Sequence, residues 1–166
     1  MLLKNIIWII GVPRSGTSIL GKIIGSCKNT EYAFEPVMLP YIIDLKKKLN
    51  FQIWKKIYEE YIQEELFFNI ITGRKINFKK NEESSINQLQ TKRDIDKKLN
   101  IKLSRLELKK YLTRKNINFV IKFPALNIKE INKEYKKDKI IIIKRNPFDT
   151  INSLLKKKWF KTQDNL

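Results

Sequence analysis

The chain opens with a run of apolar side chains that is typical of a buried strand. Residues 6–10 read Ile-Ile-Trp-Ile-Ile, with no alternation of polar positions, as in a strand covered on both faces of a parallel sheet. The run stops at Gly11 and passes through a turn of small and polar residues. Apolar residues then return at helical spacing, at Ile19, Leu20, Ile23 and Ile24. The pattern predicts a strand, a tight loop and a helix.

Three further short apolar runs predict more strands, at residues 31–34, 119–123 and 139–144. The first of them ends at Glu35-Pro36, and a proline favours an extended conformation for the residue before it. The second ends at Pro124. The third carries four consecutive isoleucines and predicts a strand that is fully buried.

Between the predicted strands, several segments show the periodicity of helices. Residues 39–72 carry an apolar stripe with Lys and Glu opposite, and Gly73 is a natural stop; the stripe consists of Ile53, Ile57, Tyr61, Leu66, Phe67 and Ile70. Trp54, Tyr58, Phe67 and Phe68 are interpreted as packing rather than base-stacking residues. Residues 74–100 are polar and weakly patterned, which indicates a surface insertion. Ser104 and Glu107 have capping-box spacing for a helix to about Lys115. Shorter helices are expected at 128–135 and from Pro147 to about Trp159.

Strands that alternate with helices predict one α/β domain over residues 1–166, with a parallel sheet, helices on both faces and a helical and polar insertion at about 39–115. Ligands of such sheets bind at the carboxyl ends of the strands. We therefore expect four features to meet at one edge of the sheet: the loop at 12–18, Glu35, Lys122 with Pro124, and Arg145.

The amino-acid composition limits the partners and the catalytic residues that this chain can be expected to have. The 35 Lys and Arg against 17 Asp and Glu give a formal net charge of +18, which favours polyanionic partners. No histidine is present, and the single cysteine, Cys27, is expected to be a small apolar filler near the end of the first helix rather than a catalytic thiol.

No apolar run approaches the roughly 20 residues that span a bilayer, and the N-terminus lacks the pattern of a signal peptide, so we expect a cytoplasmic location. The runs Lys46-Lys47-Lys48 and Lys156-Lys157-Lys158 are interpreted as solvated helix faces.

The first loop has the glycine spacing of a phosphate-binding loop, from Gly11 to Gly16. Backbone N–H groups and the positive end of a helix favour an anion at such a loop. A Walker A motif would continue with lysine after its second glycine, whereas this chain has Thr17 and Ser18 and carries Arg14 inside the loop. The missing lysine argues against an ordinary ATPase or GTPase.

A second motif, Arg-Asn-Pro-Phe-Asp-Thr-Ile-Asn-Ser, follows the isoleucine strand at residues 145–153. Asn146 is a good N-cap and Pro147 suits the first helical position. Arg145 would leave the strand end with its guanidinium available for a bidentate phosphate contact. Ser153 lies one turn beyond Asp149 and could share that phosphate.

Together, these motifs resemble the sulfotransferases that use 3′-phosphoadenosine 5′-phosphosulfate (PAPS), most closely the carbohydrate-type branch. The resemblance implies a P-loop NTPase-like, three-layer α/β/α fold. It also implies that the first motif, with Arg14, Ser15, Gly16, Thr17 and Ser18, binds the 5′-phosphosulfate, and that Arg145 and Ser153 bind the 3′-phosphate. Glu35-Pro36 matches the Glu-Pro of the carbohydrate-type enzymes, in which the Glu is the proposed catalytic base. The family generally continues beyond the second motif, so the resemblance implies a fold truncated at its C-terminus.

The resemblance implies transfer of a sulfuryl group to an acceptor hydroxyl, on a carbohydrate, without a metal. Arg14 is the first choice and Lys122 the second for the cation that assists the leaving group. Two alternatives stay open. One is a nucleotide or small-molecule kinase of the same fold, which would require Mg²⁺ and ATP. The other is a non-catalytic nucleic-acid-binding protein that uses the net charge of +18.

Overall fold

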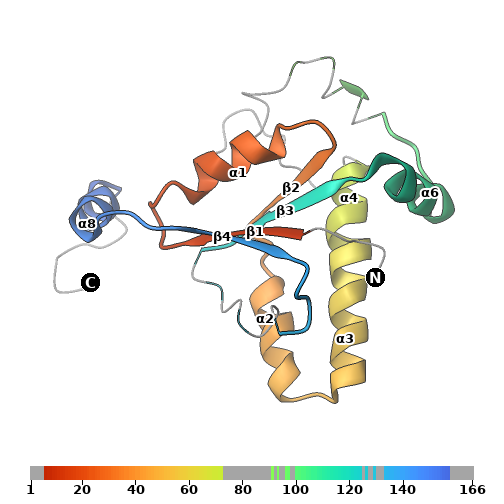
Figure 1. Ribbon diagram of the computed structural model, residues 1–166, viewed down its shortest axis with the longest axis horizontal. Helices are drawn as coiled ribbons and strands as arrows, with labels where there is room; N and C mark the ends of the chain where they lie inside the picture. The colour runs from red at the N-terminus through yellow and green to blue at the C-terminus, as the bar shows by residue number, and fades with distance from the viewer. Residues whose placement is uncertain are drawn as a thin grey trace.

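In the described part of the chain, four parallel strands form a sheet around which the other elements pack (Figure 1). The computed structural model describes residues 6–72, 91, 93, 96–97, 100–124, 126, 129 and 133–157. The strands are β1 (Ile6–Gly11), β2 (Thr30–Phe34), β3 (Asn118–Lys122) and β4 (Lys139–Ile143), in the spatial order β2-β3-β1-β4. The strands and the all-parallel sheet confirm the α/β prediction.

The register aligns the carboxyl ends of the strands. Gly11 at the end of β1 pairs with Ile143 at the end of β4, and Phe34 at the end of β2 pairs with Lys122 at the end of β3. Lys122 in turn lies beside Ile9 of β1. Whatever follows each strand therefore emerges at one edge of the sheet, with the loop after β1 between the ends of β3 and β4.

Helices cover both faces of this sheet (Figure 1). One face carries α1 (Thr17–Gly25). The other faces a helical layer made of α2 (Leu39–Asp44), the 3₁₀ turn η1 (Leu45–Lys47), α3 (Phe51–Glu60), the π-helical segment η2 (Tyr61–Phe68) and α4 (Asn69–Ile71). Helix α6 (Arg105–Lys115) precedes β3, and α8 (Pro147–Lys156) projects from the carboxyl edge of the sheet. The arrangement is compatible with a three-layer α/β/α fold.

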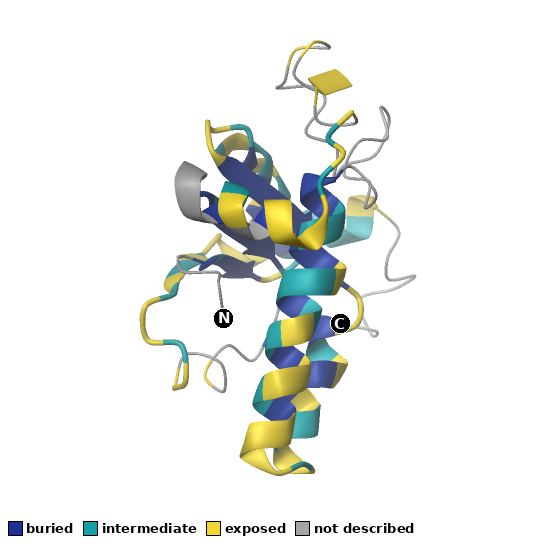
Figure 2. Ribbon diagram, turned by 90° about the vertical axis from the view of Figure 1, so that its right-hand side faces the viewer, coloured by how far each residue is buried: buried dark blue, intermediate teal, exposed yellow. Residues whose placement is uncertain are grey.

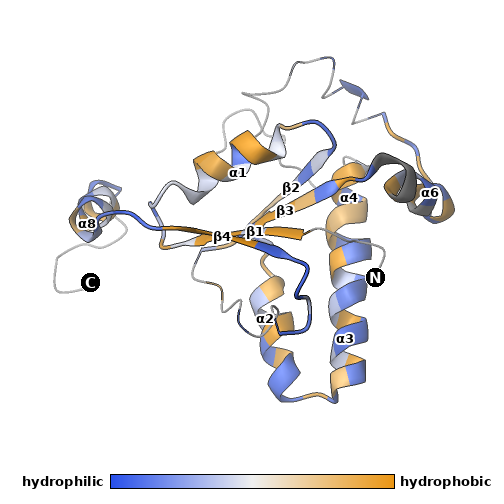
Figure 3. Cartoon of the chain, in the orientation of Figure 1, coloured by the Kyte–Doolittle hydropathy of each residue, from blue (hydrophilic) through white to orange (hydrophobic). Residues whose placement is uncertain are grey.

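The larger hydrophobic core lies between the sheet and the α2–α4 layer. Trp8 of β1, Trp54 and Tyr58 of α3 and Phe119 of β3 are buried in it. The continuous helix from α3 to α4 turns buried side chains to one side and exposed ones to the other (Figure 2). Strands β1 and β3 are largely hydrophobic along their length (Figure 3). This is the composition expected of the two central strands of a covered sheet.

A second, smaller core lies under α1, where Ile9, Tyr32 and Val120 are buried. Helix α1 reaches the sheet through small residues, since Gly21 and Gly25 lie against the Tyr32 side chain. Two of the four apolar residues whose spacing indicated this helix, Ile19 and Ile23, are instead exposed to solvent, Ile19 to 66%. The close approach of a large tyrosine to two glycines explains why the glycine face, not the isoleucine face, is buried.

Several predictions of burial are wrong. Ile53 and Ile57 are exposed, because α3 turns the Trp54–Tyr58 side toward the sheet. Strand β4 is not fully buried: it lies at the edge of the described sheet, and Ile142 is 62% exposed. Cys27 is exposed, since it follows the end of α1.

Helix ends follow the sequence closely. Ser104 and Glu107 form the predicted capping box of α6, which ends at Lys115 as expected. Asn146 caps α8 by accepting a hydrogen bond from the Phe148 N–H, with Pro147 in the first turn. Among the lysine runs, Lys46 is not solvated as predicted, because it pairs with Glu134 at 3.3 Å and lies over the Trp54 ring.

Some predictions fall on residues outside those described. These are the stop at Gly73, most of the insertion at 74–100 and half of the helix at 128–135. Residues 133–135 are described and are not helical, and α8 ends at Lys156 rather than near Trp159.

Candidate functional site

The loop between β1 and α1 has the backbone of an anion-binding turn. Arg14 and Gly16 both adopt left-handed conformations, with φ of 67° and 99°. Gly16 is the N-cap of α1, no side chain caps this helix, and its first turn contains no acidic residue. The N–H groups at the start of α1 and the positive end of its dipole are therefore available to an anion.

Ser15 lies inside this loop rather than on its outer surface. Its N–H donates to the Val12 carbonyl at 3.1 Å. Its side chain is buried against Gly11, and Oγ has no hydrogen-bond partner among the described residues. In this conformation Ser15 supports the loop from within, and its hydroxyl does not line the neighbouring cleft.

The second motif lies directly beside the loop. The Arg145 guanidinium donates from Nη1 to the Arg14 carbonyl oxygen at 2.8 Å. Arg14 in turn donates from Nε to the Ser153 Oγ at 3.1 Å. The structure thus joins two segments that are far apart in sequence, as the position of both at the carboxyl edge of the sheet requires.

A cleft of about 560 Å³ opens at this edge. It is lined by side chains and backbone from the β1–α1 loop, α1 and the ends of β2, β3 and β4: Pro13, Arg14, Gly16, Thr17, Ser18, Ile19, Lys22, Phe34, Glu35, Lys122, Pro124 and Arg145. All four features expected to converge at the edge therefore contribute to one cleft. Ser153 reaches it only through Arg14, since it is not itself a lining residue.

Glu35 and Lys122 form an ion pair in the cleft through Oε1 and Nζ. The ammonium also lies over the Phe34 ring, 4.6 Å from its centroid. The Glu35 N–H donates to the Lys122 carbonyl at 2.9 Å, extending the β2–β3 pairing by one bond. The prediction of an extended Glu35 is wrong: its φ is 42°, because the chain turns sharply at the strand end after this bond.

The strand order assigns these charges to opposite ends of the cleft. Arg145 follows β4, the loop follows β1, and Lys122 and Glu35 lie at the ends of β3 and β2. In the order β2-β3-β1-β4, Arg145 and Glu35 therefore lie on either side of the loop. The cleft can hold an elongated ligand with an anionic centre at the loop.

Lys22 is the charged lining residue that sequence reasoning missed. It lies on α1 one turn beyond Ser18, so both side chains share the helix face that borders the cleft. The sequence signal that could have identified Lys22 is its spacing of four residues from Ser18, at the end of the expected loop. In a chain with 35 Lys and Arg, a single lysine on a helix gave little reason to apply it.

Within the described residues, no three His, Cys, Asp or Glu side chains gather in a way that could hold a metal ion. Nor does any described helix have the length and hydropathy needed to cross a membrane. No protein-family model, curated protein or solved structure matches this chain.

Proposed function

We propose that this protein is a PAPS-dependent sulfotransferase with a P-loop NTPase-like fold, acting on a hydroxyl group of a carbohydrate. The observation that supports this most directly is the contact between the two motifs through Arg14. A loop for one phosphate group and an arginine–serine pair for another lie side by side, as a ligand with two separate phosphate groups requires.

The donor lies across the β1 and β4 ends of the cleft in this proposal. The first-turn N–H groups of α1 and the Arg14 side chain hold the phosphosulfate. Arg145, with Ser153, holds the 3′-phosphate. Arg14 contacts both regions, so it is suited to neutralise charge that develops on the bridging oxygen as the leaving group departs.

The acceptor lies at the β2 and β3 ends, where Glu35 acts as the base. The acceptor oxygen attacks sulfur while the bond between sulfur and the bridging phosphate oxygen breaks. Adenosine 3′,5′-bisphosphate leaves, and the acceptor proton passes to the Glu35 carboxylate. Lys122 positions that carboxylate through their ion pair, and its charge is also close enough to the cleft to assist the transferring group.

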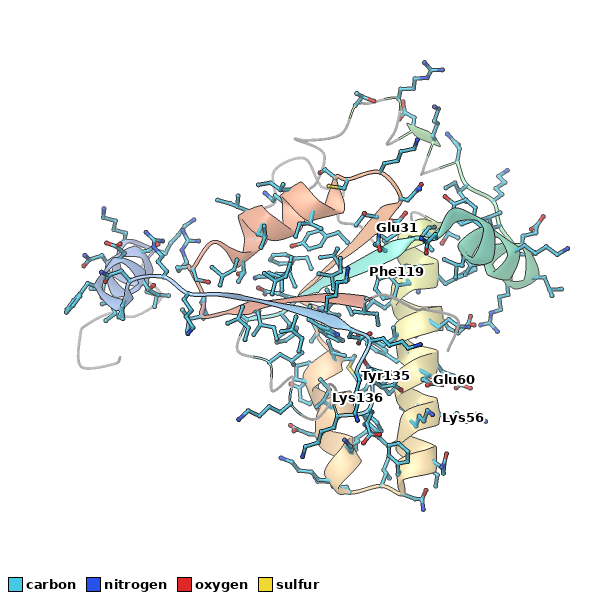
Figure 4. All side chains as sticks on the ribbon, in the orientation of Figure 1. Glu31, Lys56, Glu60, Phe119, Tyr135 and Lys136 are labelled. Carbon is cyan, nitrogen blue, oxygen red and sulfur yellow. The ribbon has the colours of Figure 1, made fainter. Side chains whose placement is uncertain are left out.

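The proposed donor distinguishes this function from its alternatives. A kinase would bind ATP–Mg²⁺ better than adenosine 3′,5′-bisphosphate, and a nucleic-acid-binding protein would prefer an oligonucleotide, with affinity that falls steeply with salt. We suggest calorimetric titration of the wild type, Arg145→Ala and Lys56→Ala with these three ligands. Lys56 is an exposed lysine on α3, on the side of the sheet opposite α1 (Figure 4), and its variant controls for loss of one charge.

We expect the bisphosphate to bind the wild type and Lys56→Ala best, and Arg145→Ala to bind it at least tenfold more weakly. Preference for ATP–Mg²⁺, or unchanged bisphosphate affinity in Arg145→Ala, would reject the proposal. Glu35→Gln should retain bisphosphate affinity and lose most transfer. Undiminished transfer would remove Glu35 from the role of base.

A further inference from the structure

Lys22 contributes a positive charge to the cleft that no described residue offsets. It forms no ion pair within the described part of the chain, although it borders the same cleft as Glu35. Its place on the helix is fixed, because its neighbour Gly21 packs against the ring of the buried Tyr32. The backbone of Lys22 is therefore held at the border of the cleft by a rigid element.

The packing of α1 places Lys22 toward the β2 side of the cleft. Gly25 lies against the Cβ of Tyr32, and Gly21 lies against the far end of the same ring. Phe34 is two residues further along β2 on the same face as Tyr32, so it lies toward the first turns of α1. Lys22 and Phe34 both line the cleft. This is the end at which Glu35, not Arg145, is found.

At this end of the cleft, no described negative charge is left to pair with the Lys22 ammonium. Glu35 and Lys122 neutralise each other through their ion pair. Arg14 and Arg145 lie toward the β4 side, where Arg145 donates to the Arg14 carbonyl and Arg14 donates to Ser153. A neutral acceptor would offer no opposite charge to the Lys22 ammonium, whereas an anionic group would pair with it.

We infer that Lys22 recognises an anionic group on the acceptor, so that the substrate is a hydroxyl compound that also carries a carboxylate, sulfate or phosphate. The inference rests on the proposed function, because that function assigns the β2 side of the cleft to the acceptor. Phe34 and Ile19 provide apolar surface for the body of the same molecule. Lys22 is a specificity residue in this assignment and takes no part in the bond changes.

The test compares two sugars that differ at one carbon, methyl β-D-glucuronide and methyl β-D-glucoside. Their affinities are measured by NMR titration of the ¹⁵N-labelled full chain, with and without adenosine 3′,5′-bisphosphate. The variants are Lys22→Met, which keeps the length and apolar stem of the side chain, and Lys56→Met as the matched control on α3. Lys22→Arg is included because it retains the charge.

We expect the wild type, Lys56→Met and Lys22→Arg to bind the glucuronide about tenfold more tightly than the glucoside, as a charge-assisted contact supplies. In Lys22→Met the ratio should fall to about one, while bisphosphate affinity stays unchanged. A preserved ratio in Lys22→Met, or no binding of the glucuronide to the wild type, overturns the inference. Loss of bisphosphate binding in Lys22→Met also overturns it, since Lys22 would then belong to the donor.

Failure of the proposed function gives a different result. In that case adenosine 3′,5′-bisphosphate fails to bind the wild type, or binds Arg145→Ala with the same affinity as the wild type. The glucuronide preference and its dependence on Lys22 are still measured in the titrations without bisphosphate. The two outcomes are therefore separable.

Discussion

Lys122 and Glu35 form an ion pair whose partners are buried to different extents: the side chain of Lys122 is 5% exposed and that of Glu35 is 37% exposed. Water can solvate the carboxylate if its partner is removed, whereas the ammonium has little access to water. Loss of Glu35 should therefore destabilise the folded protein more than loss of Lys122.

Removal of each partner should give unequal losses of stability. Glu35→Ala strands a buried ammonium, so we expect the free energy of unfolding to fall by about 2–3 kcal/mol, less than for a fully buried pair. Lys122→Met keeps the apolar stem and leaves a carboxylate that water reaches, so we expect a loss of about 1 kcal/mol or less. Urea denaturation measures both. Equal losses, or a larger loss in Lys122→Met, would contradict this account of the pair.

The glycines of α1 should not tolerate alanine. On helix propensity alone, Gly21→Ala and Gly25→Ala would stabilise α1 by about 1 kcal/mol. A Cβ at position 21 would lie 2.5 Å from the Tyr32 hydroxyl oxygen, and one at position 25 would lie 2.6 Å from the Tyr32 Cβ. Overpacking of this kind costs about 1–3 kcal/mol, so we expect both variants to be destabilised. Thermal unfolding of either variant at a higher temperature than the wild type would show that Tyr32 moves aside readily.

Asp138 should make stability depend on pH. Burial raises the pKa of its carboxyl above the ordinary value, although the Trp8 indole N–H and the Ile6 backbone N–H act in the opposite direction. The folded state then holds this proton to higher pH than the unfolded state does, so the contribution of Asp138 to stability declines as pH rises through the raised pKa.

Asp138→Asn removes that titration. The free energy of unfolding of the variant, minus that of the wild type, should therefore increase between about pH 3 and pH 7, whatever its absolute value. Denaturation curves at several pH values measure the difference. A flat difference would mean that the hydrogen bonds balance burial, and a difference that decreases with pH would mean that they outweigh it.

Ser153 should contribute less to ligand binding than Arg145. Its hydroxyl already accepts a hydrogen bond from Arg14, so a bound phosphate gains from it one hydrogen bond with an uncharged donor. Such a contact is worth about 1 kcal/mol, and we expect Ser153→Ala to bind adenosine 3′,5′-bisphosphate about fivefold more weakly. Asn152→Ala, an exposed neighbour on α8, is the control and should leave the affinity unchanged. Identical affinities in the two variants would place Ser153 outside the phosphate site.

Local patterns predicted the elements well, because each strand is a short apolar run bounded by glycine, proline or charge. The caps of α6 and α8 were also readable, since Ser104 and Asn146 act on backbone groups two or three residues away. Burial was harder to predict. Ile142 looks like a core residue in sequence but is exposed, because the strand order, a non-local property, puts β4 at the edge of the described sheet.

The candidate site also combines features that the sequence predicts with features that it does not. The expected meeting of the loop, Glu35, Lys122 and Arg145 follows from the rule that parallel strands share a carboxyl edge. The inward side chain of Ser15, the left-handed Glu35 and the inclusion of Lys22 do not follow from it. They depend on how the backbone turns at each strand end and on the rotation of α1 that Tyr32 imposes.

The position of β1 at the centre of the sheet also has a consequence for synthesis. Ile6 pairs with Phe119 and Ile7 with Lys139, so β1 leaves the ribosome long before either of the strands that flank it. Pairing across such separations is slow, and an apolar strand without neighbours is prone to aggregate. We therefore expect the nascent chain to depend on chaperones until β3 and β4 emerge, and the cleft to form only after β4 has been made.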